Sequence, residues 1–192
     1  MRNKLLVYLH GFGFDKNNNK EFVEQLANKY NAEILSLNGP YDSQRKRGGF
    51  AWYEIQKEPK KHIFDERLDL SINFIISEVS KKLEELELEW NDVIMSGRSQ
   101  GAFVSMYIAL SGKARPNKVI SLCGFYPDEI LNRGIKNKNA DIIWVEAAGD
   151  TVLTPEKKDT YKNLISKGCN ITYVIDDKSD HDNLDTTIID KL

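Results

Sequence analysis

Short apolar runs alternate along this chain with longer amphipathic stretches. Several of the short runs are apolar at nearly every position, as in KVISLC at residues 118–123. Continuous apolar runs are typical of parallel strands that helices cover on both faces. The candidate strands are residues 4–10, 32–37, 92–97, 118–123, 141–147 and 170–175.

The segments between these runs have helical periodicity. Residues 66–89 place apolar side chains along one side of a long helix, whereas 99–111 are apolar almost all round, as expected of a buried helix. A further helix begins at Pro155, a favourable first helical residue, and ends before Gly168. The predicted helices cover residues 19–30, 66–89, 99–111, 155–167 and 182–191.

Alternating strands and helices predict an α/β fold with right-handed crossovers. We expect a three-layer sandwich, with a mostly parallel sheet of about six strands between helices. The two longer connections, 38–65 and 124–140, are too short for a second domain or a large cap, so one domain is expected over residues 1–192. In such sheets the ligand site lies beyond the carboxyl ends of the strands.

Composition restricts the choice of partner and compartment. The 192 residues carry a formal net charge of −2, which provides no basic surface for nucleic acid. The apolar run at 5–9 is too short for a signal-peptide core or a membrane span, so no stable membrane insertion is expected. Cys123 and Cys169 fit no metal-ligand spacing and indicate free thiols in a reducing cytoplasm. Monomer and homodimer both remain open.

The strongest chemical signal is the pentapeptide GRSQG at residues 97–101, a G-x-S-x-G motif between a predicted strand and a predicted helix. In that setting the serine becomes a nucleophile held on a sharp turn, and glycines at both ends allow the close packing that the turn requires. Ser99 is therefore the candidate nucleophile. The simpler interpretation is a glycine-rich turn with an exposed serine.

A serine nucleophile needs a base and an orienting acid, in the chain order Ser, Asp or Glu, His. His181 is the one histidine downstream of Ser99, and it follows the last predicted strand. Asp150 is the preferred acid because it follows an earlier strand end. The acidic residues around His181 offer alternatives: Asp176, Asp177, Asp180 and Asp182.

Oxyanion stabilisation requires backbone amides after the nucleophile and after an earlier strand. The first would be the amide of Gln100. The second would be that of Phe12, in the turn HGFG at residues 10–13. We assign His10 a part in fixing this turn and none in proton transfer.

These motifs together resemble the phospholipase/carboxylesterase group of the α/β-hydrolase superfamily, which includes acyl-protein thioesterases. The resemblance rests on LHGFG at 9–13, AWY at 51–53, GRSQGA at 97–102, CGFYP at 123–127 and residues 150–155. It implies a Ser99–His181–Asp150 triad, an oxyanion site at the Phe12 and Gln100 amides, and cleavage of small-molecule esters or thioesters without a cofactor or metal.

The sequence departs from the usual family pattern at two positions. Arg98 stands before the serine, where an apolar or aromatic residue is usual, and Asp182 stands after the histidine, where a glycine or small residue is usual. Arg98 is expected either to bind an acidic group of the substrate or to pair with a nearby carboxylate.

Loop aromatics are candidate walls of the acyl pocket, or else pack on the core: Trp52, Phe125 and Tyr126. We expect hydrolysis of short or medium acyl chains through an acyl-enzyme. The alternatives are a non-catalytic binding module with this fold, and a triad hydrolase that acts on peptide or C–C bonds.

Overall fold

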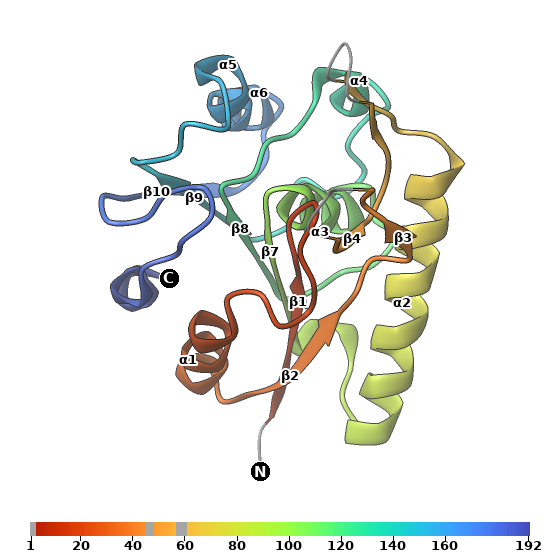
Figure 1. Ribbon diagram of the computed structural model, residues 1–192. Coiled ribbons are helices and arrows are strands. Elements are labelled where there is room, and N and C mark those ends of the chain that lie inside the picture. The colour runs from red at the N-terminus through yellow and green to blue at the C-terminus, as the bar shows by residue number, and fades with distance from the viewer. Residues whose placement is uncertain (1–2, 45–47, 57–60) are drawn as a thin grey trace.

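The computed structural model describes residues 3–44, 48–56 and 61–192. A six-stranded sheet crosses the centre of the molecule in the order β10-β9-β8-β7-β1-β2 (Figure 1). Every neighbouring pair of strands is parallel, which confirms the predicted α/β fold. Each strand begins and ends within one residue of its predicted run. The strands are β1 (Lys4–Leu9), β2 (Ala32–Leu37), β7 (Val93–Arg98), β8 (Lys118–Leu122), β9 (Ile142–Ala147) and β10 (Ile171–Asp176).

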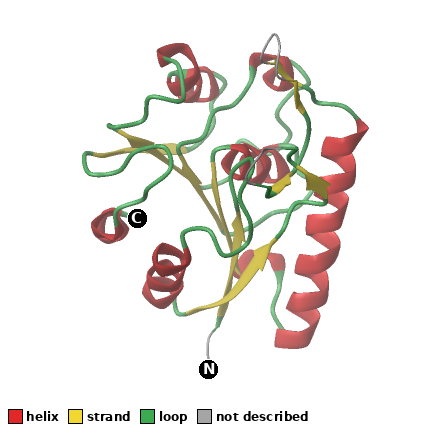
Figure 2. Ribbon diagram, in the orientation of Figure 1, coloured by secondary structure: helices red, strands yellow, loops and turns green. Residues whose placement is uncertain are grey.

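Helices cover both faces of the sheet and complete three layers (Figure 2). Strand β1 illustrates why, since Leu5 and Val7 belong to one buried cluster and Leu6 and Tyr8 to the other. The first cluster includes side chains of α2 (Glu66–Leu86), α3 (Gln100–Leu110) and α6 (Thr160–Ser166). The second includes side chains of α1 (Lys20–Tyr30) and the 3₁₀ helix η2 (Thr186–Lys191).

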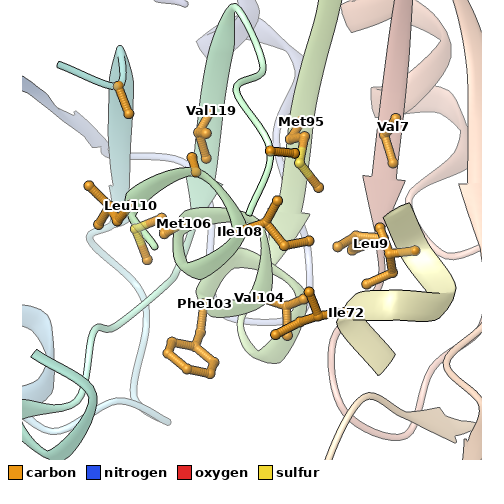
Figure 3. Close-up of a cluster of buried hydrophobic side chains, with 14 of the residues drawn as sticks. Val7, Leu9, Ile72, Met95, Phe103, Val104, Met106, Ile108, Leu110 and Val119 are labelled. Carbon is orange, nitrogen blue, oxygen red and sulfur yellow. The ribbon is translucent and has the colours of Figure 1, made fainter. Parts of the chain in front are cut away.

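Helix α3 lies at the centre of the larger cluster and is buried at every position except Tyr107. Figure 3 shows its Val104 and Ile108 among strand residues such as Met95 and Val7. A helix that is apolar on nearly all sides is buried in the core, so the packing of α3 holds the residue that precedes it against the sheet. None of the helices in the described parts of the chain is long and apolar enough to cross a bilayer.

Three of the predicted helices differ from those observed. The segment 155–167 forms two short helices, α5 (Pro155–Lys158) and α6, because the Thr160 hydroxyl donates to Lys157 O and accepts from Tyr126 N. The long helix α2 ends at Leu86, where Glu87 adopts a left-handed conformation with φ 54°. The segment 182–191 is helical only over η2.

The long connections contain small elements and no large cap among the described residues. Two antiparallel pairs follow β2, namely β3 (Tyr41–Asp42) with β4 (Phe50–Ala51) and β5 (Ile55–Gln56) with β6 (Lys61–His62). The predicted connection 38–65 includes 45–47 and 57–60, which lie outside the described residues. The remaining short elements are the 3₁₀ helix η1 (Trp90–Asp92) and α4 (Asp128–Leu131).

Candidate active site

Ser99 occupies a sharp turn between β7 and α3, where the carboxyl ends of the parallel strands meet. Its backbone has φ 52° and ψ −111°, a conformation that is strained for a residue with a side chain. The flanking glycines leave no space for a Cβ atom, since one on Gly97 would lie 2.4 Å from Gly101 O and one on Gly101 would lie 2.1 Å from Leu9 O. The turn therefore requires the two glycines of the motif.

Three side chains from separate loops meet at this turn. The Nδ1 atom of His181 lies 2.7 Å from Asp150 Oδ2, and its Nε2 atom lies 3.1 Å from Ser99 Oγ. A carboxylate only accepts, so Nδ1–H donates to Asp150 and Nε2 is left to accept the proton of the serine hydroxyl. This arrangement can transfer a proton from the hydroxyl to the imidazole as the oxygen attacks a carbonyl.

The surroundings of Asp150 favour its charged form. Burial alone raises its pKa, but hydrogen bonds from His181 and from the Leu153 and Val152 amides outweigh that cost and hold the pKa below its ordinary value. Cys123 lies beside this pair, and burial followed by the Asp150 charge raises the pKa of its thiol to about 12. The neutral thiol leaves Asp150 as the charged partner of the imidazole.

The turn after β1 lies next to Ser99 and is fixed by His10. The Nε2 atom of His10 accepts from Gly39 N at 3.0 Å, so Nδ1 carries the proton that is donated to Gly11 O at 2.7 Å. Burial lowers the pKa of His10, in agreement with a neutral ring. Phe12 follows in this turn and lines the same cavity as Ser99.

The side chain of Gln100 has a role that the sequence did not suggest. Its Oε1 atom accepts from Trp52 N at 2.9 Å and its Nε2 atom donates to Tyr53 O at 2.9 Å. The Trp52 indole in turn donates to His10 O at 2.9 Å. Gln100 thus joins the start of α3 to the segment after β4, while its own amide stands at the first position of the helix, where amides have no intrahelical acceptor.

A cavity of about 130 Å³ opens beside Ser99. Phe125 lines it, in the position expected for a pocket wall. Trp52 and Tyr126 are not among its lining residues and are almost completely buried, at 0% and 1% exposure. The lining residues are Gly11, Phe12, Phe14, Ile55, His62, Arg98, Ser99, Phe125, Val152, Leu153, Lys157, His181 and Asp182.

Sequence reasoning did not point to two polar residues of this cavity. His62 Nδ1 lies 3.1 Å from the Tyr53 hydroxyl, and His62 Nε2 lies 3.3 Å from Lys157 Nζ. Lys157 also lies over the Phe125 ring. The one available signal was position, because Lys157 follows the Asp150 loop and His62 ends the connection after β2.

Arg98 is fully buried and lies at the edge of the cavity. Its Nη2 atom is 3.1 Å from Asp182 Oδ1, and its Nη1 atom donates to Asp182 O at 2.7 Å. Of the two expectations for Arg98, the geometry supports a paired carboxylate.

The chain is similar to known proteins in both sequence and architecture. A family model described as Phospholipase/Carboxylesterase matches residues 1–181. Acyl-protein thioesterase 1 homolog 1 of Dictyostelium discoideum is 25% identical over 179 residues, which cover 88% of this chain and 79% of that protein.

Solved structures extend the similarity at the level of fold. The structure of esterase PE8 has a TM-score of 0.83 at 19% identity and is matched over 98% of this chain and 89% of its own. The Bacillus cereus carboxylesterase has a TM-score of 0.76 at 16% identity, with 98% and 85% covered.

The sheet order, with a serine turn between β7 and α3, defines the α/β-hydrolase class. Within that class the chain belongs to the phospholipase/carboxylesterase family, as the match over residues 1–181 shows. It is a hydrolase of the esterase/thioesterase type.

Proposed function

We propose that this chain, as one catalytic domain, hydrolyses small-molecule carboxylic esters or thioesters through a Ser99–His181–Asp150 triad and an acyl-enzyme intermediate. The observation that carries the proposal is the continuous hydrogen-bonded path from Asp150 Oδ2 through the His181 ring to Ser99 Oγ, with links of 2.7 and 3.1 Å. The family supports the same chemistry.

The reaction begins when Ser99 Oγ attacks the acyl carbonyl and His181 Nε2 takes the hydroxyl proton. Asp150 stabilises the imidazolium and holds its Nδ1–H in place. The amides of Phe12 and Gln100 stabilise the oxyanion, after which the alcohol or thiol leaves with the proton from His181. Water then attacks the acyl-enzyme by the same route and releases the carboxylic acid.

The volume of the cavity beside Ser99 favours a short acyl chain. A dry cavity of roughly 150 Å³ holds a benzene molecule, and the cavity beside Ser99 measures about 130 Å³. We therefore expect the highest kcat/KM for acyl groups of about two to six carbons, and no rate increase at lipid interfaces.

Fluorophosphonate labelling with peptide mapping tests the nucleophile, and it separates a hydrolase from a binding module. We expect a single labelled residue, Ser99, in the wild type and none in Ser99→Ala. Ser105→Ala is the matched control, because Ser105 is a buried serine of α3 whose hydroxyl donates to Gly101 O within the helix. It should be labelled like the wild type.

Turnover of p-nitrophenyl esters and acyl-thioesters of graded chain length tests the substrate class. Wild-type turnover by Ser99→Ala on an activated ester, or labelling elsewhere than Ser99, would refute the mechanism. Rates that keep rising beyond eight acyl carbons would refute the assignment of the cavity as the acyl site.

A further inference from the structure

The two departures from the family pattern lie on either side of the site and contact each other. Arg98 directly precedes Ser99, and Asp182 directly follows His181. They are 84 residues apart in the chain, yet Arg98 Nη1 donates to Asp182 O at 2.7 Å and Nη2 donates to Asp182 Oδ1 at 3.1 Å. One bond holds the backbone of the histidine loop and the other holds a side chain.

The guanidinium also contacts the turn after β1. The Arg98 guanidinium carbon lies 4.4 Å from the centre of the Phe14 ring, within the range of a cation–π interaction. A Cβ atom on Gly11 would lie 3.5 Å from Arg98 Nε and Nη2, so the guanidinium packs against the backbone of this turn. Phe12 lies between Gly11 and Phe14 in the sequence. Arg98 therefore contacts the segment that carries the proposed second oxyanion donor.

The loop that carries His181 depends on such contacts for its position. Residues 177–185 contain no helix or strand. The carboxylate of Asp180 accepts from the amides of Asp182 and Asn183, which fixes the shape of the loop but not its distance from Ser99. On the amino side of His181 the loop is joined to the Asp150 loop by the bond from Gly149 N to Ser179 O. On the carboxyl side Arg98 joins it to the serine turn.

We infer that Arg98 is a positioning residue that holds the His181 loop and the Phe12 turn in register with Ser99, and that Asp182 orients its guanidinium. The inference rests on the proposed function of Ser99 and His181. Arg98 and Asp182 do not touch the transferred proton. Their effect is on how often Ser99 Oγ and His181 Nε2 lie within hydrogen-bond distance.

The charge of the pair favours this role over binding of an anionic substrate. Arg98 is 0% exposed and its charge is already matched by the half-exposed Asp182 carboxylate. A substrate anion would have to displace that carboxylate from Nη2. The variants below distinguish the two roles.

The experiment compares Arg98→Met, Asp182→Ala and the double variant with the wild type. Methionine has a similar length to arginine without charge or hydrogen bonds. Asp177→Ala is the matched control, because Asp177 is an exposed aspartate of the same loop. For each protein we would measure kcat and KM on neutral and carboxylated p-nitrophenyl esters, the rate of fluorophosphonate labelling, and Tm.

We expect Arg98→Met to lower kcat about 10- to 100-fold on both esters, since misplacement of a catalytic group by about 1 Å can cost that much. KM should change less than about twofold. The Tm should change little, because the Asp182 carboxylate that loses its partner is half-exposed and is solvated by water. A merely structural role predicts instead a kcat close to that of the wild type together with a lowered Tm.

Asp182→Ala should lower kcat only about two- to fivefold, because the bond from Nη1 to the backbone remains and a half-exposed ion pair contributes little. The double variant should match Arg98→Met, since the carboxylate acts only through the guanidinium. Asp177→Ala should match the wild type.

Additive effects of the two substitutions on kcat, or wild-type kcat in Arg98→Met, would overturn the inference. A KM increase confined to carboxylated esters would assign Arg98 to substrate binding instead. If Arg98→Met does not fold, Asp182→Asn should retain wild-type kcat while Asp182→Ala does not, and equal rates for all three proteins would overturn the inference. Absence of labelling at Ser99 in the wild type would instead refute the proposed function.

Discussion

Gly101→Ala offers a direct test of how closely the serine turn is packed. Gly101 is the second residue of α3 and faces the carboxyl end of β1. A Cβ atom there would lie 2.1 Å from Leu9 O and 2.7 Å from His10 O. Both contacts are with backbone, so no side chain can rotate away to make room.

The geometry gives the size of the displacement. Ordinary contact begins near 3.4 Å, so α3 and the turn after β1 must separate by about 1.3 Å, which is 3.4 minus 2.1. Overpacking of this kind costs about 1–3 kcal/mol in the free energy of unfolding. The same movement separates the Phe12 amide from the Gln100 amide and Ser99, and a displacement of about 1 Å at reacting groups can cost 100-fold in rate.

The assay combines kcat/KM for p-nitrophenyl acetate with urea denaturation. Gly168→Ala is the control, because Gly168 lies between α6 and β10 with φ +84° and has no atom closer than 3.9 Å to the added Cβ. The free energy of unfolding of Gly168→Ala should fall by about 1–2 kcal/mol through backbone strain alone, and its activity should be unchanged. Gly101→Ala should lose about 100-fold in kcat/KM. A loss of less than threefold, or an equal loss in Gly168→Ala, would refute the reasoning.

Three further predictions concern single residues. Because Ser99 is strained at φ 52°, Ser99→Gly should be more stable to urea than Ser99→Ala by about 1–3 kcal/mol, and equal stabilities would contradict the strain. Burial lowers the pKa of His10 below 6.5, so the unfolded chain binds more protons just below that pH. The free energy of unfolding should therefore fall as the pH drops below 6.5, by at most about 1.4 kcal/mol per pH unit from this residue, and less steeply in His10→Gln. Val152 lines the cavity at 48% exposure, so Val152→Ala should move the preferred acyl chain to greater length in the ester panel without a change in Tm.

The sheet could be predicted from the sequence because its strands are buried on both faces. All six residues of β7 are buried, and the strand begins with three consecutive apolar residues, Val93 to Met95. Helix α3 could be predicted for the same reason, since a helix that is apolar on nearly all sides is stable only when it is buried in the core. The observed ends of the six strands differ from the predicted ends by at most one residue.

Local hydrogen bonds decided what the apolar pattern could not. Asp180 holds a turn where the sequence predicted the start of a helix, and the Thr160 hydroxyl separates α5 from α6. The direction of loop side chains was also undetermined. Trp52 points inward because His10 O accepts from its indole, so an aromatic that the sequence offered as a pocket wall lies beneath the site.

Arg98 and Asp182 show why a comparison of motifs can misjudge a site. Taken one at a time, each departure weakens the match beside a member of the proposed triad. The structure places the two in contact, so the second departure matches the charge that the first introduces. An apolar residue at position 98 would avoid the cost of burying a guanidinium, but apolar contacts have no preferred direction. The N–H groups on Nη1 and Nη2 of Arg98 require acceptors at particular positions. Both acceptors belong to Asp182, the residue after His181. A buried arginine is therefore suited to holding a loop that has no regular structure of its own.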